Sequence, residues 1–160
     1  MRTETIEVFK FDELSESAKD NARQWWRQAS AGDMPWADES RQSIEAFCDH
    51  FGVTLKSWNV NPYESPDYSH NADNSHFRGR KLKEFNPDYM PTGYCLDCGL
   101  WSKFHSEFKR TGDAKHAFDA ALWAGFIEWR DDMEHQLSNE YVDETIEANE
   151  YEFTEDGDIF

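Results

Sequence analysis

The last 33 residues of the chain constrain its fold most, because they combine a large negative charge with spaced apolar side chains. Between Glu128 and Phe160 there are 13 carboxylates and one arginine, Arg130. The larger apolar residues among the acids from position 140 onward are Tyr141, Val142, Ile146, Tyr151, Phe153 and Ile159. Disordered acidic chains are poor in such side chains. We therefore expect this segment to fold and its carboxylates to form an ordered surface.

The excess negative charge is concentrated in this segment. The formal net charge of the protein is −17, and residues 128–160 account for −12 of it. A chain with this charge repels nucleic acid and anionic membranes, so we expect it to bind neither directly. The charge favours a partner with a basic surface, or serves solubility alone.

Length and cysteine content indicate the broad class of protein. The chain has 160 residues, which predicts a single domain over residues 1–160. Its three cysteines are Cys48, Cys95 and Cys98. A low and odd count, without a signal peptide or a long apolar run, predicts a protein of the reducing cytoplasm.

Hydrophobic periodicity predicts an α+β fold, with several helices packed on one face of a small, mostly antiparallel sheet. Helices are expected over 15–29, 35–51, 100–111 and 113–139, the last being the longest, with a short one over 143–148. Strands are expected at 5–11, 53–60, 76–82 and 151–153. Residues 61–75 are expected to form a long loop, and residues 84–99 a second irregular stretch.

Two blocks resemble a known but uncharacterised protein family. They are "TIEVFKFDELSESAKDNARQWWRQ" (5–28) and "DETIEANEYEFTEDG" (143–157), together about a quarter of the chain. They are similar to a bacteriophage and prophage family, some members of which are labelled "antitoxin of toxin–antitoxin stability system". Residues 53–112 depart from that pattern. The resemblance implies a small phage gene product that binds host machinery, and it supplies no catalytic residues.

The acidic segment is the first candidate site. On a helix, Glu140, Glu144 and Glu147 share one face, where neighbouring like charges in water repel by roughly 0.7 kcal/mol. A basic partner would relieve that repulsion, and a row of carboxylates imitates the phosphates of a nucleic acid. The expected partner-binding residues are Glu140, Asp143, Glu144, Glu147, Glu150, Glu152 and Glu155. The alternative is a solvated face that keeps the protein soluble.

Cys95 and Cys98 form the second candidate site, because CxxC spacing suits half of a structural zinc site. His105 is the nearest further ligand, and no second ligand pair follows. A redox CxxC usually begins a helix, whereas here Pro and Gly surround the motif, so two plain thiols in a loop are favoured. HExxH, GxSxG and P-loop motifs are absent, which favours a protein that is not an enzyme.

Two further clusters bear on partner binding. Trp25 and Trp26 are adjacent on one predicted helix, so either one is exposed as an interface anchor or flanking loops cover it. The basic residues Arg78, Arg80, Lys81 and Lys83 are expected to pair with the chain's own acids, or to contact the acidic segment in a homodimer.

These observations predict a non-enzymatic inhibitor of phage origin that mimics nucleic acid. Its partner would be a host protein or ribonucleoprotein complex with a basic nucleic-acid-binding surface, as for an anti-CRISPR or anti-restriction protein. One alternative, from the family label, is an antitoxin-like protein that neutralises a toxin. Another is a small zinc-dependent enzyme.

Overall fold

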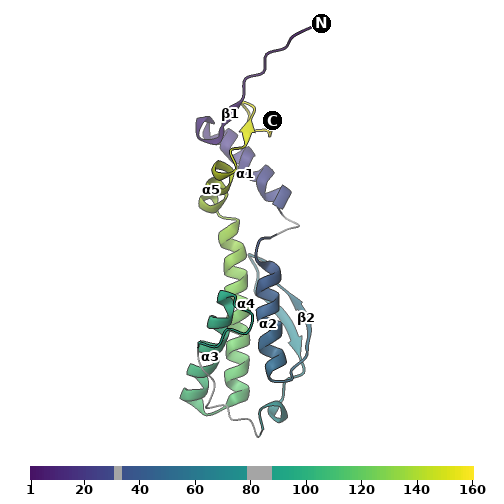
Figure 1. The fold of residues 1–160 in the computed structure, drawn as a ribbon, viewed down its shortest axis with the longest axis vertical. Helices are drawn as coiled ribbons and strands as arrows, with labels where there is room; N and C mark the ends of the chain where they lie inside the picture. The colour runs from purple at the N-terminus through teal and green to yellow at the C-terminus, as the bar shows by residue number, and fades with distance from the viewer. Residues whose placement is uncertain (31–33, 79–87) are drawn as a thin grey trace. The chain divides into compact units, whose positions relative to one another are not determined.

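The computed structural model describes residues 1–30, 34–78 and 88–160, and the chain divides into two compact units. The terminal unit contains Met1–Met34 and Glu134–Phe160, and the central unit contains Pro35–Met133. The described elements are helices and two small antiparallel sheets, which confirms the α+β class (Figure 1). The single domain expected over residues 1–160 stays a prediction.

The terminal unit brings the two ends of the chain together. Strand β1 (Phe9–Lys10) is followed by the 3-10 helix η1 (Phe11–Glu13) and by α1 (Glu16–Ser30). Helix α5 (Asn139–Ala148) and strand β4 (Glu152–Phe153) come from the other end of the chain. Strand β1 pairs antiparallel with β4, with Phe9 opposite Phe153 and Lys10 opposite Glu152.

Local sequence explains both helices of this unit. The Ser15 hydroxyl accepts a hydrogen bond from the backbone N–H of Ala18 at 3.3 Å, as expected of an N-cap. The Ser138 hydroxyl likewise accepts a hydrogen bond from the backbone N–H of Tyr141 at the start of α5, also at 3.3 Å. Apolar residues at helical spacing then meet in one core: Phe11, Leu14, Ala18, Ala22, Trp26, Val142, Ile146 and Phe153. Burying each large side chain contributes about 1.5–3 kcal/mol.

The central unit packs three helices and a hairpin around a core rich in aromatic residues. It contains α2 (Ala37–His50), β2 (Leu55–Asn59), β3 (Asp67–His70), the 3-10 helix η2 (Asn74–Phe77) and α3 (Cys95–Thr111). It also contains α4 (Ala114–Gln136) up to Met133. Phe47 of α2 stacks on Phe118 of α4 with ring centroids 5.2 Å apart. The long helix predicted in the C-terminal half is thus confirmed, and its stripe of Phe118, Leu122, Phe126 and Trp129 lies in this core.

The structure corrects four local predictions, two here and two in residues 76–99. A single sheet was expected, but the strands form two separate two-stranded sheets, β1–β4 and β2–β3. Residues 61–75 were expected to be a loop, but they include β3. The sequence of β3, DYSH, has only Tyr68 as a large apolar residue. The Tyr68 ring stacks on the Phe126 ring with centroids 4.3 Å apart, and no local sequence pattern indicates this long-range contact.

The other corrections concern residues 76–99. A strand was expected at 76–82. Residues 76–77 instead form the end of η2, and residues 79–82 lie outside the described residues. Residues 95–99, expected to be irregular, form the first turn of α3. In the described part of the chain, no helix is both long enough and apolar enough to span a membrane.

Candidate functional site

Helix α5 carries a row of carboxylates on its solvent-facing side. Glu140, Glu144 and Glu147 are exposed and lie four and three residues apart. The opposite side of the helix is fixed, because Val142 and Ile146 have no exposed surface. Among the described residues, no Lys, Arg or His forms an ion pair with these three carboxylates. The row is therefore ordered, and its charge is not neutralised locally.

Asp143 does not belong to this row. Its two oxygens accept hydrogen bonds from Nε and Nη2 of Arg23 on α1, at 2.6 and 2.7 Å. The Arg23 side chain is only 11% exposed, and its pKa is raised, mainly by the hydrogen bond to Asp143. This carboxylate therefore joins α5 to α1, and its assignment to partner binding stays a prediction.

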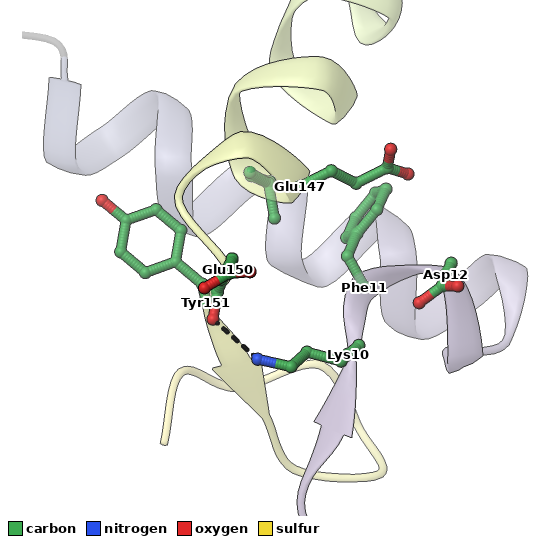
Figure 2. A pocket seen from close by; sticks show the side chains of 7 residues that line it. Lys10, Phe11, Asp12, Glu147, Glu150 and Tyr151 are labelled. Atoms are coloured by element: carbon green, nitrogen blue, oxygen red, sulfur yellow. Dashed lines mark hydrogen bonds between the residues drawn. The ribbon is translucent and has the colours of Figure 1, made fainter.

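Lys10 partly neutralises the acids that follow α5. Its ammonium group lies 3.4 Å from the Glu152 carboxylate and donates to the backbone carbonyl of Glu150 at 3.1 Å (Figure 2). Glu152 is therefore paired, whereas the carboxylates of Glu150 and Glu155 are exposed, with no ion pair among the described residues.

A cavity of about 310 Å³ lies beside the acidic row. Phe11 and Tyr151 supply its aromatic walls, and Lys10 reaches into it (Figure 2). Its remaining lining residues are Asp12, Ile146, Glu147 and Glu150. The acidic surface is thus hollowed at the point where α5 meets β1 and η1.

Neither tryptophan of the pair on α1 is a free anchor. Trp26 is buried and packs edge-on against Tyr141, with ring centroids 6.5 Å apart. Trp25 is half-buried and contacts the rings of Tyr151 at 5.2 Å and Phe153 at 6.0 Å. Tyr151 and Phe153 of the C-terminal segment, not a flanking loop, partly cover Trp25. Of the two alternatives, the structure favours the one in which neither Trp is fully exposed, and a role for either as a partner anchor stays a prediction.

The zinc ligands suggested by the sequence do not come together. Cys98 and His105 lie on the same helix seven residues apart, which separates them by about 10 Å along its axis. Ligands of one zinc ion need metal bonds of about 2.0–2.3 Å. In the described ranges, no group of three His, Cys, Asp or Glu side chains is arranged to hold a metal ion. The proposed set of Cys95, Cys98 and His105 is corrected accordingly.

The start of α3 holds a second, smaller cavity that sequence reasoning missed. It measures about 270 Å³, and Tyr94, Cys95, Glu128 and Trp129 are among its lining residues. The pKa of Glu128 is raised, chiefly by burial of its carboxyl group and further by Asp132. No local pattern connects Glu128 with Cys95, which is more than 30 positions away, so only the CxxC motif marks this region in the sequence.

The basic cluster is only partly described. Arg78 is exposed, and Arg80, Lys81 and Lys83 lie outside the described residues. The expected homodimer contact through this cluster stays a prediction.

Comparisons of the chain with protein-family models, with curated proteins and with solved structures found no match. The function is therefore inferred from the residues and geometry of the site.

Proposed function

We propose that the chain is a non-enzymatic binding protein of phage origin that uses its acidic face to imitate nucleic acid. The acidic face consists of Glu140, Glu144 and Glu147 on α5 with Glu150 and Glu155 after it. Its partner is the basic nucleic-acid-binding surface of a host defence complex, so the protein acts as an inhibitor of the anti-CRISPR or anti-restriction type. The phage origin rests on the resemblance of residues 5–28 and 143–157.

The observation that carries the proposal is the ordered, unneutralised row on α5. Helix geometry places its charges about 4.5–6 Å apart along the axis, a little more widely than the 3.4 Å between successive nucleotides of a strand. Because Val142 and Ile146 hold the opposite side of the helix, the backbone of the row is ordered before a cationic groove binds it, and only side-chain freedom is lost on binding. A solvated face that only kept the protein soluble would not need its carboxylates in a fixed arrangement.

The proposal is tested by capture from a host lysate followed by affinity measurement. The tagged protein is expected to capture a nucleic-acid-binding complex, and nucleic acid is expected to compete for it. The triple variant Glu140→Gln, Glu144→Gln, Glu147→Gln should weaken binding at least tenfold, because three charges that face the groove are lost at nearly constant side-chain shape.

A matched control changes the same number of exposed carboxylates in the central unit: Asp49→Asn, Glu64→Gln and Asp67→Asn. This variant should bind within about twofold of the unaltered protein. Equal weakening by both triple variants, or none by either, would exclude the acidic face as the binding surface. Capture of one small toxin protein in place of a nucleic-acid-binding complex would favour the antitoxin alternative.

A further inference from the structure

We propose that Cys95 and Cys98 form a reversible dithiol–disulfide site at the amino-terminal end of α3, a modification site independent of the acidic face. Cys95 is the first residue of this 17-residue helix and Cys98 the fourth, so the motif lies where redox-active CxxC pairs lie and not in a loop. Both cysteines are exposed. Cys48, by contrast, is buried, and burial raises the pKa of its thiol to about 12.

Helix geometry brings the two cysteines within reach of each other. Residues three apart in an α-helix have Cα atoms about 5 Å apart, within the 4.4–6.8 Å that disulfides span. Their Cβ atoms are about 5–6 Å apart, and a disulfide needs about 3.5–4.5 Å. The first turn must therefore tighten by about 1–2 Å. The N–H of Cys95 has no intrahelical acceptor to lose in this movement.

Asp97, which lies between the two cysteines in sequence, holds the first turn of α3 in place. Its side chain is fully buried, and its Oδ2 accepts hydrogen bonds from the Thr92 N–H, the Thr92 hydroxyl and the Gly93 N–H at 2.9, 2.8 and 3.1 Å. These bonds hold residues 92–93 against the first turn of α3. Its Oδ1 is buried and has no hydrogen-bond partner among the described residues. Asp97 thus anchors the turn that carries both thiols, and the two thiols lie on the exposed side of that turn.

The reaction is a thiol–disulfide exchange with a small disulfide as oxidant. The thiolate of one cysteine attacks the small disulfide, forms a mixed disulfide and releases one small thiolate. The second protein thiolate attacks the mixed disulfide at the protein sulfur, closes the Cys95–Cys98 bond and releases the second small thiolate. Two electrons pass to the oxidant, and the two protons of the protein thiols end on the small thiols.

The test exposes the folded, reduced protein to the neutral 2-hydroxyethyl disulfide and follows intact mass and peptide maps. The expected product has lost two hydrogens and contains a Cys95–Cys98 disulfide, while Cys48 stays reduced. The single variants Cys95→Ser and Cys98→Ser should each accumulate the mixed disulfide at the remaining thiol. Its lifetime should be at least tenfold longer than that of any mixed disulfide on the unaltered protein.

Each other outcome overturns the proposal. A stable mixed disulfide on the unaltered protein would show that the second thiol does not reach the first. A disulfide between chains, seen as a dimer on a non-reducing gel, would show that the pair is not intramolecular. No reaction at either cysteine would show that the thiols are not active. Circular dichroism of the two Ser variants separates these results from misfolding.

Discussion

At the scale of single residues, Glu128 is in an unfavourable environment for a charged carboxylate. A Cβ atom built on Gly99 of α3 would lie only 2.2 Å from the Glu128 Oε2, so the carboxyl group lies against that helix. Burial of the carboxyl group raises its pKa, and Asp132 raises it further. The folded state therefore holds the Glu128 proton more tightly than the unfolded state does. The stability of the protein falls as pH rises from the ordinary glutamate pKa through the raised pKa of the folded state.

The replacement Glu128→Gln should therefore stabilise the protein at neutral pH. At pH 7 the charged carboxylate of this partly exposed residue bears a desolvation cost that the neutral glutamine largely avoids, so Tm should rise by about 1–2 °C, the effect of roughly 0.5 kcal/mol after allowance for solvent screening. At about pH 3.5, below the ordinary glutamate pKa of about 4.3, the carboxyl is protonated in both states and the difference should vanish. Scanning calorimetry of both proteins at the two pH values measures this. A Tm difference that did not change with pH would contradict the assignment.

At the scale of elements, the contact between α1 and α5 depends on a charged pair as well as on apolar packing. Arg23 donates two short hydrogen bonds to Asp143 in a partly buried position, and its Nη1 donates a third to the Asp20 carboxylate at 2.7 Å. Hydrogen bonds to charged groups contribute more than neutral ones. The pair therefore fixes the orientation of α5, and with it the direction in which the acidic row faces.

The replacement Asp143→Asn should destabilise the terminal unit by about 1.5 kcal/mol, because Arg23 keeps one neutral amide acceptor in place of a carboxylate that accepts two hydrogen bonds, while its side chain stays largely buried. Native-state hydrogen exchange of the α1 and α5 amides measures the change. The neighbouring replacement Glu144→Gln is the control, and it should stay within about 0.5 kcal/mol of the unaltered protein. Similar effects of both replacements would indicate that Asp143 does not join the two helices.

At the scale of the whole molecule, the charge of −17 sets how the protein meets any basic partner. Charges distributed in this way attract a cationic surface over about 10 Å at 0.1 M salt, a distance that shortens as salt is added. Attraction of this kind accelerates association more than it slows dissociation.

The association rate with the captured partner should therefore fall more than tenfold when salt is raised several-fold, while the dissociation rate changes much less. Surface plasmon resonance across a salt series separates the two rates. An association rate insensitive to salt would contradict nucleic-acid mimicry, even if the protein bound its partner tightly.

The sequence predicts the elements that have a strong local pattern. Helices α1 and α2 were expected because apolar residues recur every three or four positions and because Ser15 is a suitable N-cap. The long α4 was expected because Phe118, Leu122, Phe126 and Trp129 form one continuous stripe. Strand β3 was missed, because its one large apolar side chain, Tyr68, is held by a ring on α4 and not by a neighbour in sequence.

The sequence alone determined the net charge, the concentration of carboxylates near the C-terminus and the amphipathic pattern that makes α5 a helix, because these depend only on composition and on spacing within one turn. Only the tertiary structure decided which acids are unpaired, because Asp143 meets Arg23 and Glu152 meets Lys10 across more than 100 residues of chain. It also decided that Tyr151 and Phe153 partly cover Trp25 and that Cys95 begins a helix. Such contacts arise from packing, and residues distant in sequence carry no local signal of the partners they will meet.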